Sequence, residues 1–455
     1  MQVTSQRSLT RLFSISFLCL FAAALVILPS SCSKKDDKEP PVPSISEFTS
    51  STGSLSGPKN TEIIISGQNF PVSAGSIVVK VNGKECTILE QGANRVTAKI
   101  PARCGSGKVE VTINGKATEG PEFAYQYSYE LVSVTNGIKG MEDGPINTAK
   151  FDQLAGIAID ADNNYYLGHF PAPKLRKVSA AGMVSLLAGN DQRGIVDGTG
   201  AAAGFRYPEY LSMGRDGNIY VADAGVPGAI RRVTPAGVVT TLATFENQQI
   251  FAVAATPTAI YATNNYNYIY KLDYNGSLIW SLFTKYDFMN SNSNWYIDGD
   301  TSVASFNMYG NITVDKDEKY LYFGNIYGPR GGNTKASFLR RLDLTTGIMS
   351  TLAGGNTSIA VDGPAAQARF NLIWDIEVGP DGKIYMAEAM NNRIRVYDNG
   401  TVSTLVGTAG EGDVDGNLQN AKIDYPVSLQ FDKNGDLVIV CSGSTLPKIK
   451  KIIID

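Results

Sequence analysis

The side chains that could support catalysis are few in this chain of 455 residues. A single histidine, His169, argues against a histidine-based triad and against several common zinc sites. Carboxylates remain, and Asp223 and Glu388 each end an apolar, strand-like segment. Such oxygen ligands suit a hard cation such as calcium. We therefore expect no catalytic residue, no bound metal and no cofactor, and keep open a metal-assisted lyase or lactone hydrolase, with calcium as its cation.

Aromatic residues gather in a few long polar segments and favour ligand binding. These segments are NNYNY at 264–268, TKYDFMNSNSNWYIDG at 284–299 and GNIYGPRGGNTKASF at 324–338. Trp and Tyr rings present large flat apolar faces with a polar edge, which suits the face of a sugar. We predict a carbohydrate-binding site formed by Tyr266, Trp295, Tyr296, Tyr327, Trp374 and Asp375. The alternative is that some of these rings only pack the long loops.

One segment, DVDGN at 413–417, is similar to the start of a calcium-binding loop. Leu418 stands where that loop requires glycine, and the segment belongs to a repeat found elsewhere in the chain. We therefore interpret it as a turn.

That repeat predicts the architecture that must position the site. The related segments are DGPINTAKF at 143–151, DGTGAAAGF at 197–205, DGDTSVASF at 298–306, DGPAAQARF at 362–370 and DGNLQNAKI at 415–423. Strand-like stretches follow each one, as in NLIWDIEVG, PDGKIYMAE, NNRIRVYD and TVSTLVG. Units of about 40–50 residues with four strands are typical of a β-propeller. The double spacing between Asp197 and Asp298 indicates a further unit without the DG segment, and hence six blades.

The last repeat stops before its fourth strand. The segment YELVSVTNG at 129–137 is similar to the fourth strands of other units, so we expect it to complete the sixth blade. Closing the ring in this way removes an unpaired sheet edge.

Equivalent positions within the repeat differ in how much they vary. The second strands end in His169, Asp223, Asn264, Asn325, Glu388 and Cys441, whereas the third strands carry Arg176, Arg231, Arg340, Arg395 and Lys450. We interpret the repeated cation as a shared structural bond. The stretches GPDGKIYMAEAMNNRIRVYD and VSTLVG resemble NHL repeats, and this resemblance extends over 129–455. It implies a propeller that binds ligands, serves as a scaffold or, in a few cases, is an enzyme, since a fold does not determine an activity.

A smaller domain precedes the repeats. TEIIISG, IVVKVNG and KVEVTING alternate apolar and polar residues, and NG pairs mark hairpin turns, which predicts a β-sandwich. ISGQNF, VKVNGKECTI and GKVEVTING resemble the IPT/TIG family of immunoglobulin-like domains over 44–126. The resemblance implies a spacer or interaction module without catalysis. Whether Cys86 and Cys104 form a disulfide is left open, because spacing does not decide pairing.

The first residues read as an export signal. Arg7 and Arg11 precede the apolar run LFSISFLCLFAAALVIL, which ends in LPSSC. LPSSC resembles a bacterial lipobox, with 1–31 as signal peptide, Cys32 lipidated and 32–43 as a tether. SKKDDKE after Cys32 is similar to the export tags of surface lipoproteins in Gram-negative bacteria. A transmembrane anchor and an ordinary cleaved signal are the alternatives.

These observations combine into one hypothesis. The net charge of −3 offers no basic surface for nucleic acid. We expect an all-β protein in which a small Ig-like sandwich precedes a six-bladed β-propeller (127–455) closed by an N-terminal strand. It would be a non-catalytic lipoprotein of the outer membrane, exposed on the cell surface, where it binds a glycan or another extracellular ligand. Protein partners in an uptake complex, and a purely protein-binding scaffold, remain open.

Overall fold

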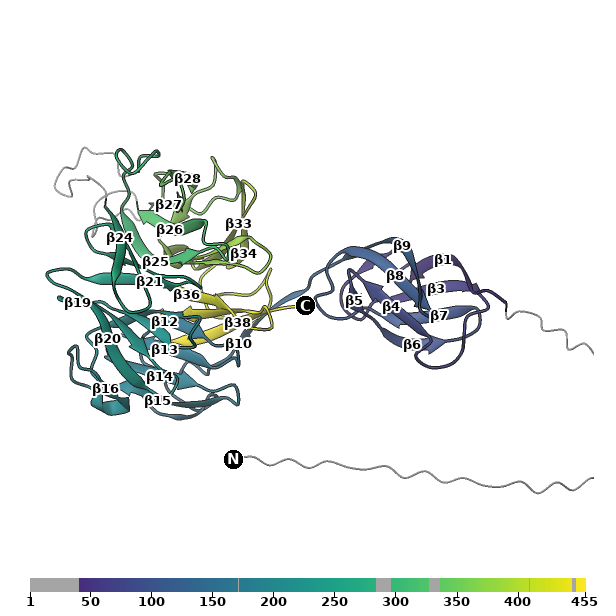
Figure 1. Cartoon of the computed structure of the whole chain (residues 1–455), viewed down its shortest axis with the longest axis horizontal. Coiled ribbons are helices and arrows are strands. Elements are labelled where there is room, and N and C mark those ends of the chain that lie inside the picture. The colour runs from purple at the N-terminus through teal and green to yellow at the C-terminus, as the bar shows by residue number, and fades with distance from the viewer. Residues whose placement is uncertain (1–40, 171, 284–295, 327–335, 409, 444–446) are drawn as a thin grey trace, which may run out of the picture.

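The computed structural model describes residues 41–170, 172–283, 296–326, 336–408, 410–443 and 447–455, which form two β-rich units (Figure 1). The described residues contain strands and two short 3-10 segments, η1 (Gly200–Ala202) and η2 (Ala389–Asn391), but no α-helix. The predicted all-β class is therefore confirmed. None of the described residues belongs to a helix long and apolar enough to cross a membrane.

The first unit is a sandwich of two sheets. One sheet has the order β1 (Ser44–Ser50), β3 (Glu62–Gln68), β7 (Arg95–Lys99) and β6 (Thr87–Gln91). The other has the order β2 (Ser56–Gly57), β9 (Lys116–Tyr125), β8 (Gly107–Ile113), β4 (Ile77–Val81) and β5 (Lys84–Glu85). Alternate residues such as Ile63, Ile65, Val79 and Val81 are fully buried, as the sequence alternation predicts.

Cys86 and Cys104 lie in this core as free thiols. Burial, with a smaller contribution from Cys104, raises the pKa of Cys86 to about 12. The pairing that the sequence left open is therefore absent from the structure.

The second unit contains six sheets, which we call blades one to six in chain order. Their inner strands contact one another in a closed ring, because β12 contacts both β17 and β36. Blade one contains β12 (Leu154–Ile159), β13 (Tyr165–His169), β14 (Lys174–Val178) and β15 (Met183–Gly189), and blade two contains β17 (Pro208–Met213), β18 (Ile219–Asp223), β19 (Gly228–Val233) and β20 (Val238–Phe245). Blade three contains β21 (Ile250–Ala255), β22 (Ile260–Asn264), β23 (Tyr268–Leu272) and β24 (Leu278–Phe283), and blade four contains β25 (Met308–Val314), β26 (Tyr320–Ile326), β27 (Ala336–Asp343) and β28 (Met349–Gly354). Blade five contains β31 (Ile373–Val378), β32 (Ile384–Glu388), β33 (Arg393–Asp398) and β34 (Thr401–Val406), and blade six contains β36 (Pro426–Phe431), β37 (Leu437–Cys441), β38 (Lys448–Ile454) and β10 (Tyr129–Ser133).

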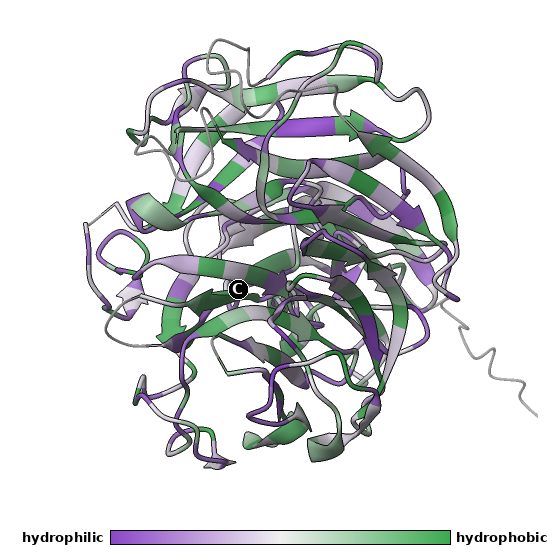
Figure 2. Cartoon of the chain, turned by 90° about the vertical axis from the view of Figure 1, so that its left-hand side faces the viewer, coloured by the Kyte–Doolittle hydropathy of each residue, from purple (hydrophilic) through white to green (hydrophobic). Residues whose placement is uncertain are grey.

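Blade six closes the ring with a strand from the start of the unit. β10 pairs antiparallel with β38, with Tyr129 opposite Ile454 and Ser133 opposite Lys450. Leu131 of β10 is fully buried in the core shared with blade five. The predicted closure by an N-terminal strand is therefore confirmed. Along many propeller strands hydrophobic and hydrophilic residues alternate (Figure 2), as expected for sheets that pack on their neighbours.

The repeated DG segments form the joints between blades. Their short strands, which pair with outer or neighbouring strands, are β11 (Gly144–Pro145), β16 (Gly198–Thr199), β29 (Gly363–Pro364), β30 (Phe370–Asn371) and β35 (Gly416–Asn417). At the joint before blade two, the Arg231 guanidinium donates to the carbonyls of Gly204 (2.8 Å) and Val196 (2.9 Å) and pairs with Asp197 at 3.1 Å. Its guanidinium carbon lies 5.0 Å from the centre of the Phe205 ring.

The same ion pair occurs at the other DG joints. It joins Arg176 to Asp143, Arg340 to Asp298, Arg395 to Asp362 and Lys450 to Asp415. The interpretation of the repeated cation as a structural bond is therefore confirmed. Blade three, which has no DG segment, carries Tyr270 at the corresponding position, and its hydroxyl bonds to Gln248 at 2.7 Å.

Polar contacts join the sandwich to blade six. Arg103 pairs with Asp436, and Lys59 pairs with the side chain of Asp455. Backbone hydrogen bonds between Ser128 and Asp455 continue this contact. The sandwich consequently lies beside β10 and β38 (Figure 1).

Candidate functional site

Each inner strand has an irregular register near its first residue. In β17, Pro208 is opposite Asp223 and Tyr210 is opposite Ala222, so Glu209 is an extra residue. Phe251, Trp374 and Val427 are extra in the same way in β21, β31 and β36. A β-bulge changes the direction in which a side chain points. The propeller therefore turns one variable position per blade toward its axis.

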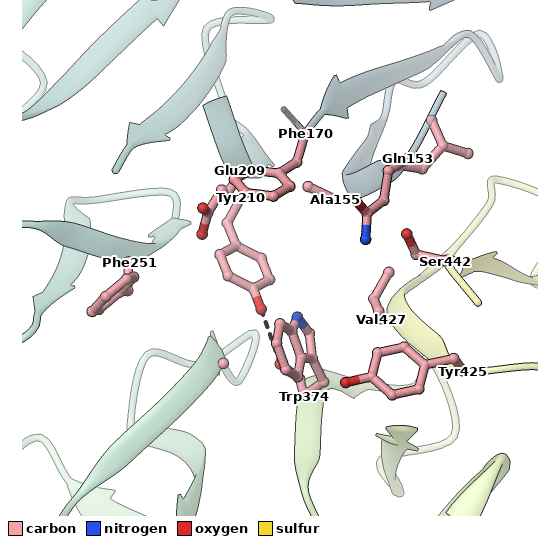
Figure 3. Close-up of a pocket in the computed structure, with 12 residues that line it drawn as sticks. Gln153, Ala155, Phe170, Glu209, Tyr210, Phe251, Trp374, Tyr425, Val427 and Ser442 are labelled. Carbon is pink, nitrogen blue, oxygen red and sulfur yellow. Dashed lines mark hydrogen bonds between the residues drawn. The ribbon is translucent and has the colours of Figure 1, made fainter. Parts of the chain in front are cut away.

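These residues surround a cavity of about 330 Å³ at the mouth of the central channel. Every blade contributes to it, and the close-up in Figure 3 shows its walls. The lining residues are Gln153, Leu154, Ala155, Phe170, Glu209, Tyr210, Phe251, Gly310, Trp374, Tyr425, Val427 and Ser442. This volume lies in the ordinary range for small-molecule sites.

Five of the described lining residues carry aromatic rings, namely Phe170, Tyr210, Phe251, Trp374 and Tyr425. The ring centres of Trp374 and Tyr425 are 6.1 Å apart with an interplanar angle of 57°. The Tyr210 hydroxyl reaches the Trp374 carbonyl at 3.4 Å, which links blades two and five across the mouth. Figure 3 shows the Gln153 amide and the Ser442 hydroxyl near each other on the side opposite Phe251.

Among the described residues that line this cavity, Glu209 is the only one with an ionisable carboxylate or ammonium group. Burial, and to a smaller extent the nearby Asp223 carboxylate, raises the pKa of Glu209 to about 7. Its carboxyl group therefore changes charge near neutral pH, because the cavity wall solvates the ionised form poorly.

A second, polar cavity of about 160 Å³ continues down the channel between the inner strands. Asp375 belongs to this cavity, and it accepts hydrogen bonds from Ser428 Oγ (2.8 Å) and the Leu429 amide (2.9 Å). Burial raises its pKa to about 6. Burial and the proximity of Asp375 raise the pKa of Glu377, also in this wall, to about 8.

The structure separates the residues of the sequence-predicted site. Trp374 lines the mouth cavity and Asp375 lies in the channel cavity below it. Tyr266 is 48% exposed and outside both cavities. The Tyr296 ring packs against Phe338, with ring centres 4.0 Å apart. Trp295 and Tyr327 lie outside the described residues, so a site over blades three and four remains a prediction.

Sequence reasoning missed most of the mouth cavity. Glu209, Tyr210, Phe251 and Tyr425 stand in short apolar segments that carry no motif. A signal was nevertheless present. In blades one, two, three, five and six, the position after the first residue of the inner strand is occupied by Ala155, Glu209, Phe251, Trp374 and Val427, and such variation within a regular repeat marks a position that packing does not dictate.

The carboxylates of the metal-assisted alternative are occupied by protein donors. Asp223 accepts the amides of Arg206 and Tyr207 and pairs with Arg231, while Glu388 pairs with Arg395. In the part of the chain that the structure describes, no three His, Cys, Asp or Glu residues are placed to hold a metal ion.

The contacts of His169 and of the DVDGN segment, the two other features that the sequence offered for chemistry, are also structural. Burial lowers the pKa of His169 to about 3, and the neutral ring stacks on Phe151 at 6.3 Å. In DVDGN, Asp413 pairs with Lys448, and Asp415 accepts the Ser133 amide at 2.8 Å. The interpretation of this segment as a turn in a joint is consistent with these contacts.

Comparisons with known proteins support this architecture. The IPT/TIG domain family matches residues 43–129. A curated relative, the chloroplastic protein SUPPRESSOR OF QUENCHING 1 of Arabidopsis thaliana, is 24% identical over 333 residues. That match covers 69% of this chain, but the chain spans only 26% of the length of the relative.

Solved structures share the fold over most of the chain. A protein of unknown function from Bacteroides thetaiotaomicron VPI-5482 has a TM-score of 0.64 at 17% identity, covering 92% of this chain and 99% of its own. An auxiliary nutrient binding protein from the same organism has a TM-score of 0.56 at 17% identity, covering 90% and 97%. Another, from Bacteroides ovatus ATCC 8483, has a TM-score of 0.52 at 17% identity, covering 90% and 98%. The sandwich followed by a propeller is thus a shared arrangement.

Proposed function

We propose that this protein binds a small carbohydrate in the cavity at the channel mouth and catalyses no reaction on it. The observation that carries the proposal is the composition of the cavity wall. Aromatic rings from several blades surround a space of about 330 Å³ and leave only a few polar groups facing it. A pocket that is mostly apolar with a small number of placed polar groups is typical of small-molecule recognition.

The rings suit a sugar because its C–H face can stack on them while its hydroxyl groups remain hydrogen-bonded. Trp374 and Tyr425 offer the stacking surface. Gln153, Ser442 and Glu209 offer the donors and acceptors. Two solved proteins with this fold are named auxiliary nutrient binding proteins, which agrees with a role in ligand capture. The proposal includes anchorage at the cell surface through lipidated Cys32.

The test is glycan-array screening of residues 33–455, followed by calorimetry with the best ligand. This fragment keeps every described residue. Trp374→Ala should weaken binding at least about tenfold, because stacking on the ring is lost. Tyr266→Ala is the matched control, since Tyr266 is exposed and lies outside the cavity.

The two variants separate the alternatives. If Tyr266→Ala abolishes binding and Trp374→Ala does not, the ligand lies over blades three and four, as the sequence predicts. If no glycan binds, a carbohydrate ligand is excluded. Circular dichroism of both variants must match that of the parent.

A further inference from the structure

The charge distribution of the mouth cavity selects among small ligands. Its described lining residues include aromatic, aliphatic and neutral polar side chains, and Glu209 is the one among them with a charge. No lysine or arginine is found among the described residues that line this cavity. An anionic ligand would therefore meet no compensating charge, whereas a cationic ligand would meet a carboxylate in a partly desolvated site.

Glu209 has no partner that uses its carboxylate. Among the residues that the structure describes, none donates a hydrogen bond to this group or forms an ion pair with it. This contrasts with Asp223 and Glu388, which end the second strands of blades two and five and pair with Arg231 and Arg395. A half-buried carboxylate without a protein donor is suited to a donor from the ligand.

The strands around Glu209 supply no cation. β12 and β21 carry no ionisable side chain, as their sequences LAGIAI and IFAVAA show. β13 ends in His169, which is neutral because burial lowers its pKa. β18 ends in Asp223, whose charge is matched by Arg231 of β19. Tyr165 and Tyr166 of β13, and Tyr220 of β18, lie toward the starts of their strands, away from the strand ends near Glu209.

Aromatic rings flank this carboxylate. Figure 3 shows the Glu209 carboxylate beside the Tyr210 ring, on the side of the cavity from which Phe251 projects. The face of an aromatic ring attracts a cation, and the attraction is worth about 0.5–2 kcal/mol, increasing as water is excluded. A carboxylate next to such faces is an arrangement that recognises organic ammonium groups.

We propose that the ligand carries an ammonium group, as an amino sugar does, and that this group is held between Glu209 and the neighbouring rings. The inference rests on the proposed function and deepens it by naming the class of sugar. The remaining part of the ligand would stack on Trp374 and Tyr425, while the ammonium nitrogen donates to the Glu209 carboxylate. A disaccharide is about the size that the cavity of about 330 Å³ admits.

Protonation of Glu209 links this recognition to pH. Burial raises the pKa of Glu209 to about 7, so the group is largely neutral in mildly acid solution. A bound cation favours the ionised form. Affinity for a cationic ligand should therefore fall as the pH decreases below about 7, whereas affinity for an uncharged ligand should not follow this titration.

The experiment uses two disaccharides of the same linkage, the β1,4-linked dimer of glucosamine, whose nitrogens carry charge, and the same dimer with both nitrogens acetylated and uncharged. Calorimetry at pH 7 should give at least about tenfold tighter binding of the amine. Glu209→Gln should remove that preference. Glu246→Gln, at an exposed glutamate between β20 and β21, is the matched control and should retain the preference.

The outcomes distinguish this inference from the proposed function. If the parent bound both sugars equally and Trp374→Ala lost that binding, the ammonium proposal would be overturned, whereas the proposal of carbohydrate binding at the mouth cavity would stand. The same result would follow if Glu209→Gln kept the preference. If neither these sugars nor any array glycan showed Trp374-dependent binding, both proposals would be wrong.

Discussion

At the scale of single residues, the buried arginines of the joints have the clearest energetic role. Arg231 is fully buried and bonds to Asp197, Asp223 and two backbone carbonyls. Asp223 needs this cation because its carboxylate is fully buried and no water can replace the charge there. The arrangement therefore contributes most through the penalty that its disruption would bring.

We predict that Arg231→Ala lowers the free energy of unfolding by about 3–5 kcal/mol, because it leaves Asp223 buried without its counter-charge. The neighbouring residue on the same strand, Arg232, is half-buried and faces the other side. Arg232→Ala should cost less than about 1 kcal/mol. Urea unfolding of both variants measures the difference, and equal losses would contradict the structural role of Arg231.

A second prediction at this scale concerns the channel carboxylates. Burial and Asp375 raise the pKa of Glu377 from 4.5 to about 8. The folded state then binds the proton more tightly than the unfolded state, so the contribution to stability is complete below about pH 4.5 and is lost as the pH increases through about 8. Glu377→Gln should therefore stabilise the protein at pH 9 relative to the parent and have little such effect at pH 4.5.

Urea unfolding at these two pH values measures this effect. Glu122→Gln, at an exposed residue of the sandwich, is the control and should preserve the parent's pH dependence. If Glu377→Gln also preserved it, the channel would be wetter than the contacts around Glu377 indicate.

At the scale of elements, β10 decides whether the propeller is a closed ring. It lies between β38 and β35 in blade six, and without it β38 would expose its backbone donors and acceptors. Its buried Leu131 also packs in the core shared with blade five. The bulges of the inner strands are the corresponding elements for the site, since in blades one, two, three, five and six they direct a side chain to the cavity.

We predict that a chain beginning at residue 138 melts more than about 5 °C below a chain beginning at residue 127, because the shorter chain loses β10 and its buried leucine. Both chains lack the sandwich and its contacts with Asp436 and Asp455, so only the strand differs. Calorimetry gives the two melting temperatures. Coincident transitions would show that blade six is stable with three strands.

At the scale of the whole molecule, the sandwich lies between the predicted tether and the propeller along the chain. The sandwich occupies the N-terminal side of the propeller and contacts blade six through Arg103 and Lys59. The predicted tether precedes the sandwich in the chain. A lipid attached at Cys32 would then leave the propeller separated from the membrane by an entire domain.

We predict that Cys32→Ser releases the protein from the membrane fraction, because lipidation at this residue is the proposed anchor. Fractionation of cells that express the parent and the variant, with immunoblotting, measures the release. Cys19→Ser, within the predicted signal segment, is the control and should leave the protein attached. Retention of the Cys32→Ser protein would contradict anchorage by lipid at this position.

The sequence by itself determined the architecture. The DG segments, the alternating strands and the match of residues 129–137 to other fourth strands predicted the propeller and its closure, because each repeat encodes its own turns and its own buried face. The sandwich was recognisable for the same reason. These features are local in the chain, and the structure confirms them at β10, β38 and the arginines of the joints.

Only the tertiary structure decided which residues share the mouth cavity. Its walls come from residues as distant as Gln153 and Ser442, which meet because six inner strands converge on one axis. A one-residue bulge determines whether Glu209 or a neighbour faces that axis, and no local pattern encodes the choice. Likewise Asp375, adjacent to Trp374 in sequence, points into the channel below, since successive residues of a strand face different ways.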